Sequence, residues 1–177
     1  MVLSDFDLSP KAGEKTGAGL QGVAFGFLYA DNPHLQLEIG KVRTGSKRVS
    51  RAGDIDGWDG DRLAMLAEVK QFTIEEDAVP RRTGFANEVG RRGEVGIVFA
   101  LGFSEEAEEA IEGLGLKPLT LEDAAYIVDF WDPIKEKIAV SSFLYYAGHV
   151  EQNSSLTRRL QEFLAAASTP PSPTPPE

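Results

Sequence analysis

Leu63-Ala-Met-Leu-Ala-Glu-Val-Lys-Gln-Phe72 is a nearly continuous apolar run, and it predicts a β-strand that is buried on both faces. The tripeptide Asp59-Gly60-Asp61 comes shortly before it and is a hairpin turn signal, so we expect the strand to pair with the segment that contains Asp54-Ile55-Asp56. Two charged residues, Glu68 and Lys70, interrupt the apolar run. Because charged side chains are seldom buried unless they are paired, these two residues require a structural or chemical reason.

The segments on either side of this hairpin predict further strands and helices. On the N-terminal side, glycines recur at a spacing of three to four and favour a closely packed helix over residues 11–29. Apolar and polar residues then alternate over residues 35–39, as in a half-buried strand.

On the C-terminal side, strands and helices are expected to alternate. Ser104 and Thr120 are the expected N-caps of two helices, the first at 105–112 and the second ended by Asp132-Pro133. A buried strand, a short strand and a final helical region in two pieces are expected at 94–101, 116–119 and 134–167. This order predicts an α/β fold, with a sandwich built around a mixed β-sheet.

Length and composition limit the classes of protein that fit. The chain has 177 residues, of which 42% are hydrophobic and 26% charged, which is typical of one globular domain, expected at residues 1–167. The proline-rich residues 168–177 predict a disordered tail. With no cysteine and only His34 and His149, the chain offers no thiolate chemistry and little basis for a histidine metal site. No leader sequence and no apolar run of about 18 residues is visible, so we expect a soluble, cytoplasmic protein.

The predicted hairpin brings charged side chains together. Side chains alternate between the faces of a strand, so Glu68 and Lys70 share one face, and Asp54 and Asp56 share a face of the neighbouring strand. If the register places both pairs on the same side, carboxylates converge beside an ammonium group. Mg²⁺ prefers such oxygen ligands, and the carbonyl of Val69 is a further one. Lys70 would orient a metal-bound water or stabilise a pentavalent phosphate, so the pattern favours metal-assisted phosphodiester hydrolysis.

A plainer interpretation of the same residues is an exposed edge hairpin. The carboxylates would then be solvated and Lys70 would form a simple ion pair. The apolar character of residues 63–72 argues against this interpretation, because a solvated strand would carry more polar positions.

Glu68-Val69-Lys70, preceded by two aspartates on the paired strand, resembles the motif of the PD-(D/E)XK nuclease superfamily, which has the restriction-endonuclease-like fold. The resemblance covers about residues 15–165. The order of elements after residue 94 looks like the Mrr-type and type II restriction branch. The glycine-rich N-terminal helix and residues 51–56 and 129–135 are most similar to SacI-type restriction endonucleases.

This resemblance implies an α/β/α sandwich with a central mixed β-sheet and the activity of a Mg²⁺-dependent DNA endonuclease of restriction or defence type, with Mn²⁺ as a substitute metal. By position, Glu68 and Lys70 match the second acid and the lysine of the motif. The first acid is either Asp54, which follows a glycine where the family often has proline, or Asp56; Asp54 is favoured. The implied catalytic residues are Asp54, Glu68 and Lys70, and the implied metal ligands are Asp54, Asp56, Glu68 and Val69.

Other functions remain open at this point. The chain could be a catalytically silent DNA-binding or assembly module of the same fold, or a nuclease domain that takes its specificity from a partner subunit. Homodimerisation would let one small domain cut both strands of DNA. The net charge of −10 does not exclude DNA as the partner, because residues 101–136 hold ten acidic and two basic residues, whereas residues 41–51 hold five basic residues and no acidic one.

A few further residues are candidates for the site or for DNA contact. Glu14 and Gln21 could reach the metal site from the N-terminal helix, but packing is the favoured interpretation for both. Gln71 and the tryptophans Trp58 and Trp131 are expected to be structural. The basic residues expected to contact phosphate are Lys41, Arg43, Lys47, Arg48, Arg51, Arg81, Arg82, Arg91 and Arg92.

Overall fold

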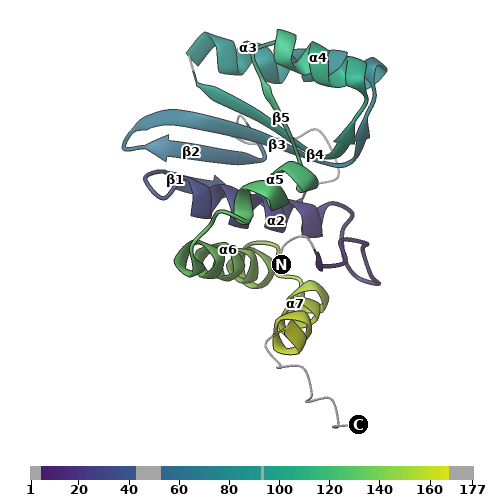
Figure 1. The fold of residues 1–177 in the computed structure, drawn as a ribbon, viewed down its shortest axis with the longest axis vertical. Helices are drawn as coiled ribbons and strands as arrows, with labels where there is room; N and C mark the ends of the chain where they lie inside the picture. The colour runs from purple at the N-terminus through teal and green to yellow at the C-terminus, as the bar shows by residue number, and fades with distance from the viewer. Residues whose placement is uncertain (1–4, 43–52, 93, 168–177) are drawn as a thin grey trace, which may run out of the picture.

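The computed structural model describes residues 5–42, 53–92 and 94–167, and its centre is a five-stranded sheet (Figure 1). The strand order is β1-β2-β3-β4-β5. The first three strands are antiparallel neighbours, whereas β4 runs parallel to β3 and β5 parallel to β4. The strands are β1 (Gln36–Ile39), β2 (Ile55–Asp59), β3 (Arg62–Ile74), β4 (Val95–Phe103) and β5 (Lys117–Thr120).

Helices cover both faces of this sheet. In Figure 1, α3 and α4 lie on one side, and α2, α5 and α6 lie on the other. The α/β sandwich around a mixed sheet is therefore confirmed. Within the described ranges, no helix has the length and apolar character needed to span a membrane. The helices are α2 (Ala18–Asp31), α3 (Thr83–Arg92), α4 (Glu105–Gly113), α5 (Leu121–Val128), α6 (Pro133–Tyr145) and α7 (Ser154–Ala167), with a 3-10 turn at Glu76–Arg82 and a π-helical turn at Tyr146–Val150.

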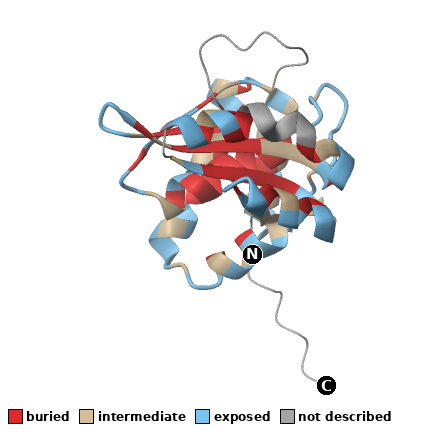
Figure 2. Ribbon diagram, turned by 90° about the horizontal axis from the view of Figure 1, so that it is seen from above, coloured by how far each residue is buried: buried red, intermediate tan, exposed pale blue. Residues whose placement is uncertain are grey.

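Strand β3 is central in the sheet and contributes to the core on both faces. Its Met65 and Ala67 belong to the larger apolar cluster, together with residues of α2 and α6. Its Leu66 belongs to a second cluster, which includes residues of α3 and α4. The buried residues follow the strands and the helices next to them (Figure 2). The predicted strand buried on both faces is therefore confirmed, and it extends over Arg62–Ile74.

The β2–β3 hairpin has the turn that the sequence predicts. Asp59 pairs with Arg62, and Gly60 between them has φ +63°, a left-handed conformation that glycine adopts without steric cost. Further along the hairpin, Ile55 lies opposite Ala67. This register places Asp54, just before β2, close to the position opposite Glu68.

The N-terminal helix is shorter than predicted, and its glycines explain how it packs. Helix α2 begins at Ala18 rather than near residue 11, because Gly17 has φ +94° and ends the preceding turns. A Cβ atom on Gly22 would lie 2.3 Å from a ring carbon of Phe143, and one on Gly26 would lie 2.5 Å from the Ala139 carbonyl oxygen. Helix α2 therefore packs against α6 at a distance that only glycine permits, as the glycine spacing predicts.

The predicted helix caps are confirmed on the C-terminal side. The Ser104 side chain accepts a hydrogen bond from the Ala107 amide at 3.2 Å. Thr120 and Asp123 form a reciprocal capping box at the start of α5. Asp132 not only follows the end of α5 but also caps α6.

Residues 76–92, for which no element was predicted, form a 3-10 turn and helix α3. Phe85, Ala86 and Val89 on α3 are buried in the second apolar cluster. Tertiary packing on the sheet therefore stabilises a helix whose sequence, with two glycines in ten residues, is a weak helix former.

Candidate active site

The structure brings Asp54, Glu68 and Lys70 together. The Lys70 ammonium nitrogen lies 3.1 Å from Glu68 Oε1 and 3.9 Å from Asp54 Oδ2. The side chain of Glu68 is 8% exposed, whereas those of Lys70 and Asp54 are 20% and 24% exposed. The three groups are thus held in a partly shielded cluster that solvent still reaches.

The position of Asp54 follows from where strand β2 begins. The Asp54 amide donates to the Ala67 carbonyl at 2.9 Å, and Asp54 Oδ2 accepts from the Val69 amide at 2.9 Å. The carboxylate therefore satisfies a backbone donor of β3 just beyond the pairing with β2. In an extended strand the N–H and C=O of one residue point to the same edge, so the Val69 carbonyl faces the side on which Asp54 lies.

Asp56 has a different environment from Asp54. It is 3% exposed, and its Oδ1 accepts a hydrogen bond from the Gly53 amide at 2.9 Å. A Cβ atom on Gly53 would lie 2.7 Å from the Ala67 carbonyl oxygen, so the close approach of the chain to β3 requires glycine there. Asp56 and Gly53 thereby fix the backbone that carries Asp54. These contacts favour Asp54 as the acid beside Lys70.

The donor set fits Mg²⁺. Two carboxylates, of Asp54 and Glu68, lie within 4 Å of one ammonium group, and the Val69 carbonyl adds a neutral oxygen. Among the described residues, no group of three histidine, aspartate or glutamate side chains is arranged to hold a metal ion. Mg²⁺ does not require such a group, because it is usually held by one or two carboxylates, waters and phosphate oxygens.

A polar cluster around the buried Glu151, which the sequence did not reveal, contains Lys15, Val42, Tyr146 and Glu151 (the Glu151 cluster). The Lys15 ammonium nitrogen lies 2.8 Å from Glu151 Oε1 and donates to the Val42 carbonyl at 2.8 Å. The Val42 amide and the Tyr146 hydroxyl donate to Glu151 Oε2 at 2.8 and 3.4 Å. Because this set joins residues 15, 42, 146 and 151, no local sequence pattern indicates it.

The electrostatic environment of Tyr146 connects this cluster with the candidate site. Tyr146 is fully buried. Burial raises the pKa of its phenol well above the usual value, and the negative charges of Glu151 and Asp54 raise the pKa further. The Asp54 carboxylate is therefore close enough to Tyr146 to contribute to the raised pKa of its phenol.

Glu14 and Gln21 make structural contacts, as favoured from the sequence. Glu14 Oε2 accepts from Arg159 at 2.5 Å, and its Oε1 accepts from Ser155 at 2.8 Å. The Gln21 side chain donates to the Gly40 carbonyl at 2.9 Å.

Gln71 and the tryptophans also have structural surroundings. The Gln71 amide donates to the Leu8 carbonyl at 2.9 Å. Trp131 stacks on Phe27, with ring centroids 5.4 Å apart, and Trp58 packs on the second apolar cluster. These contacts agree with the expected packing roles.

Most of the predicted phosphate contacts fall where the structure gives no description. Arg43, Lys47, Arg48 and Arg51 lie outside the described residues, as does the tail at 168–177. The side chains of Arg81, Arg82 and Arg92 are likewise outside the description. Of the other two, Lys41 donates to Gln152 at 2.6 Å and Arg91 pairs with Glu88 at 2.8 Å.

Comparison with known protein families found no family model that matches this chain, and comparison with curated proteins found no match either.

Proposed function

We propose that this chain is a Mg²⁺-dependent DNA endonuclease that hydrolyses phosphodiester bonds, with Asp54, Glu68 and Lys70 as its catalytic residues. The observation that carries this proposal is the position of one ammonium group within 3.1 and 3.9 Å of two carboxylates from adjacent strands. Buried ion pairs alone do not require this arrangement, because a second, partly exposed carboxylate adds repulsion. A site that binds a cation and a phosphate accounts for it, because the carboxylates can hold the cation and the ammonium group the phosphate.

The arrangement of the strands supports membership of the PD-(D/E)XK nuclease superfamily. The first acid directly precedes β2, and the second acid lies on its antiparallel neighbour β3. On β3 one residue separates the second acid from the lysine, and β4 follows parallel to β3. Together with the resemblance of the sequence, this favours a restriction-type enzyme similar to the SacI-type and Mrr-type endonucleases.

Each residue has a role that its position permits. Asp54 and Glu68 offer carboxylate oxygens to the cation, and Val69 offers its carbonyl. When bound, Mg²⁺ would supply Lewis acidity at the phosphate and an acidified water. Lys70 donates hydrogen bonds and places positive charge where negative charge develops on the phosphate oxygens in the transition state. Asp56 has a contact to Gly53 that positions Asp54, and its role as a ligand remains a prediction.

The charge distribution is compatible with DNA as the partner. Residues 41–51, which carry five basic and no acidic residues, directly precede Asp54 in the sequence. Such a segment can neutralise backbone phosphates next to the site, although the chain is acidic overall. We further propose that the protein acts in the cytoplasm, and that a homodimer or a partner specificity subunit positions it on both strands of DNA.

The proposal is tested by incubating purified protein with supercoiled plasmid in Mg²⁺, in Mn²⁺ or in EDTA. We expect nicking or linearisation only with the divalent cations. Glu68→Gln and Lys70→Ala are expected to reduce the rate by at least about 100-fold, because each removes a charge that acts on the transition state. Lys137→Gln, an exposed position on α6, is the matched control and should keep the activity.

Two outcomes would contradict the proposal. Full activity in both Glu68→Gln and Lys70→Ala would show that the site lies elsewhere. Salt-dependent DNA binding by a folded protein with no cleavage in either metal would instead favour the catalytically silent module. Circular dichroism and a thermal melt of each variant establish that it is folded.

A further inference from the structure

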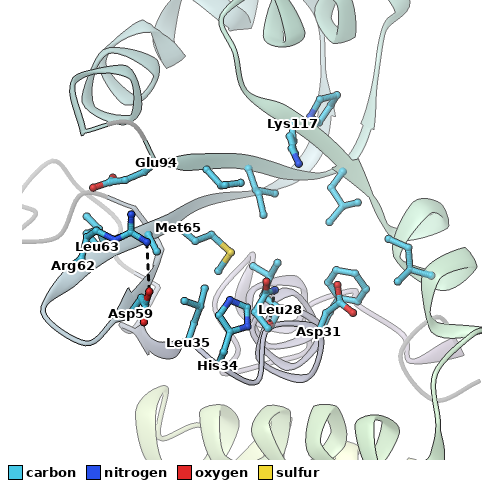
Figure 3. A pocket seen from close by; sticks show the side chains of 18 residues that line it. Leu28, Asp31, His34, Leu35, Asp59, Arg62, Leu63, Met65, Glu94 and Lys117 are labelled. Atoms are coloured by element: carbon cyan, nitrogen blue, oxygen red, sulfur yellow. Dashed lines mark hydrogen bonds and ion pairs between the residues drawn. The ribbon is translucent and has the colours of Figure 1, made fainter.

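A cavity of about 640 Å³ lies at one end of the sheet, where the β2–β3 hairpin turns and strands β4 and β5 begin (Figure 3). Strand β3 contributes Arg62–Met65 to its wall, and none of the proposed catalytic residues lines it. Met65 precedes Glu68 by three residues, which corresponds to about 10 Å along a strand. The cavity is therefore a separate feature from the candidate active site.

The inner wall of the cavity is apolar. It is formed by residues of the larger core cluster that are at most 9% exposed, so it is held in place by the packing of α2 on the sheet. A volume of several hundred Å³ with such a wall is typical of sites that bind small organic molecules. The buried apolar residues of the wall are Phe27, Leu28, Leu35, Met65 and Ile97.

The rim of the cavity carries carboxylates that already have partners inside the protein. Asp59 is 3.4 Å from Arg62 across the hairpin turn. Asp31 accepts hydrogen bonds from Trp131 at 3.3 Å and from Lys135 at 3.0 Å. Glu94 lies on another side of the rim, well separated from Lys117 in the view of Figure 3. Arg62 and Lys135 therefore compensate the charges of Asp59 and Asp31.

Lys117 is the second cation of the rim, besides Arg62, which pairs with Asp59. It lies next to Ile97 in the parallel β4–β5 register, so its side chain leaves the sheet on the same face as the apolar wall. Figure 3 shows Lys117 and His34 directed toward the hollow from opposite sides. Both residues are exposed, so both are accessible to a group that enters from solvent. The ammonium group of Lys117 would receive an anionic group of a ligand.

We propose that this cavity binds a small organic molecule with an apolar body and a single anionic group, which lies beside Lys117. The apolar body contacts Met65, Ile97 and Phe27. We assign the ligand one acidic group because Arg62, the other cation of the lining, already pairs with Asp59. This binding site goes beyond the nuclease function and uses none of its residues, so either proposal can fail without the other.

Two naphthalene probes test this site. Anilinonaphthalene sulfonate has an aromatic body and one anionic group, and N-phenyl-1-naphthylamine is its neutral counterpart. We expect saturable fluorescence enhancement with both. Lys117→Gln should weaken binding of the sulfonate about two- to fivefold, the range of a partly screened ion pair, and leave the neutral probe unaffected. Lys137→Gln, an exposed lysine that does not line the cavity, is the matched control.

The location of the probe is measured from the NMR signals of methionine methyl groups. The chain contains only Met1 and Met65, so a protein labelled at its methionine methyl groups reports the cavity through a single signal. Both probes should shift the Met65 signal, which Met65→Leu assigns, and leave Met1 unchanged. The proposal is overturned if neither probe binds saturably, if the Met65 signal stays fixed at saturation, or if Lys117→Gln leaves the affinity for the sulfonate unchanged.

Discussion

Asp54 and Asp56 are two residues apart and differ in what their carboxylates contact. Asp54 lies beside Lys70 and is partly exposed, whereas Asp56 is buried and holds the Gly53 amide. We therefore expect Asp54→Asn to reduce Mg²⁺-dependent cleavage by at least about 100-fold with little change in stability. Asp56→Ala should lower the free energy of unfolding by about 1–3 kcal/mol, because it leaves a buried amide without its acceptor. Plasmid cleavage and urea unfolding measure the two effects.

The isosteric variant Asp56→Asn separates the structural role of this residue from a catalytic one. Its amide oxygen can still accept from Gly53, so the fold should be kept while the negative charge is lost. If Asp56→Asn abolishes cleavage and Asp54→Asn does not, Asp56 is the first acid of the motif and the assignment above is reversed.

Tyr146 predicts how stability depends on alkaline pH. The pKa of its phenol is raised in the folded protein, so as pH rises the unfolded chain loses this proton first. The contribution of Tyr146 is fully present below about pH 10 and decreases above it by about 1.4 kcal/mol per pH unit. Urea unfolding from pH 9 to 11 should show wild type losing stability faster than Tyr146→Phe. Equal pH dependence of the two proteins would contradict the buried environment of the phenol.

At the scale of elements, two glycines on different helices should respond in opposite ways to the same substitution. On α2, Gly22→Ala would place a methyl group 2.3 Å from the Phe143 ring, and we expect a loss of about 1–3 kcal/mol in the free energy of unfolding. On α3, Gly90 is exposed and a Cβ atom added there would meet open space, so Gly90→Ala should stabilise by about 0.5–1 kcal/mol. Urea denaturation measures both. Stabilisation by both substitutions would show that α2 and α6 are not in close contact.

The elements that were predicted correctly are those indicated by residues close together in the sequence. The turn at Gly60 and the caps at Ser104 and Thr120 depend on residues no more than three positions apart, and all three are found. Helix α3 was not predicted, because its stability comes from burial of Phe85 and Val89 on a sheet whose strands are distant in sequence. The early start predicted for α2 was wrong, because its apolar spacing did not reveal the left-handed conformation of Gly17.

At the scale of the whole molecule, the candidate site depends on local sequence signals, whereas its surroundings depend on tertiary packing. Asp54, Glu68 and Lys70 meet through one hairpin, whose turn and alternation of faces can be read from the sequence. The Glu151 cluster could not be predicted, since its members come from three separate segments, around residues 15, 42 and 146–151, which meet only after the chain has packed together. The cavity beside Lys117 is equally a product of tertiary packing.

The segregation of charge over the whole chain predicts how DNA binding depends on salt. The logarithm of affinity falls with the logarithm of salt concentration by about 0.9 for each phosphate that a basic side chain neutralises. Replacing Lys47 and Arg48 with glutamine should therefore make this slope less steep by about 2. The matched control is the pair Lys137→Gln and Arg158→Gln, both exposed and on α6 and α7, which should leave the slope unchanged.

Fluorescence anisotropy with a labelled duplex, over a range of salt concentrations at constant Mg²⁺, measures these slopes in the Glu68→Gln background, where cleavage does not interfere. If the protein with Lys47 and Arg48 replaced has the same salt slope as the protein that keeps them, residues 41–51 do not contact phosphate. Equal decreases in both pairs of variants would show that binding responds to total charge alone. A decrease confined to the Lys47/Arg48 variant is the expected result, because only that segment is basic and adjacent in sequence to Asp54. An acidic chain can then bind DNA, since local phosphate neutralisation, rather than net charge, sets the salt dependence.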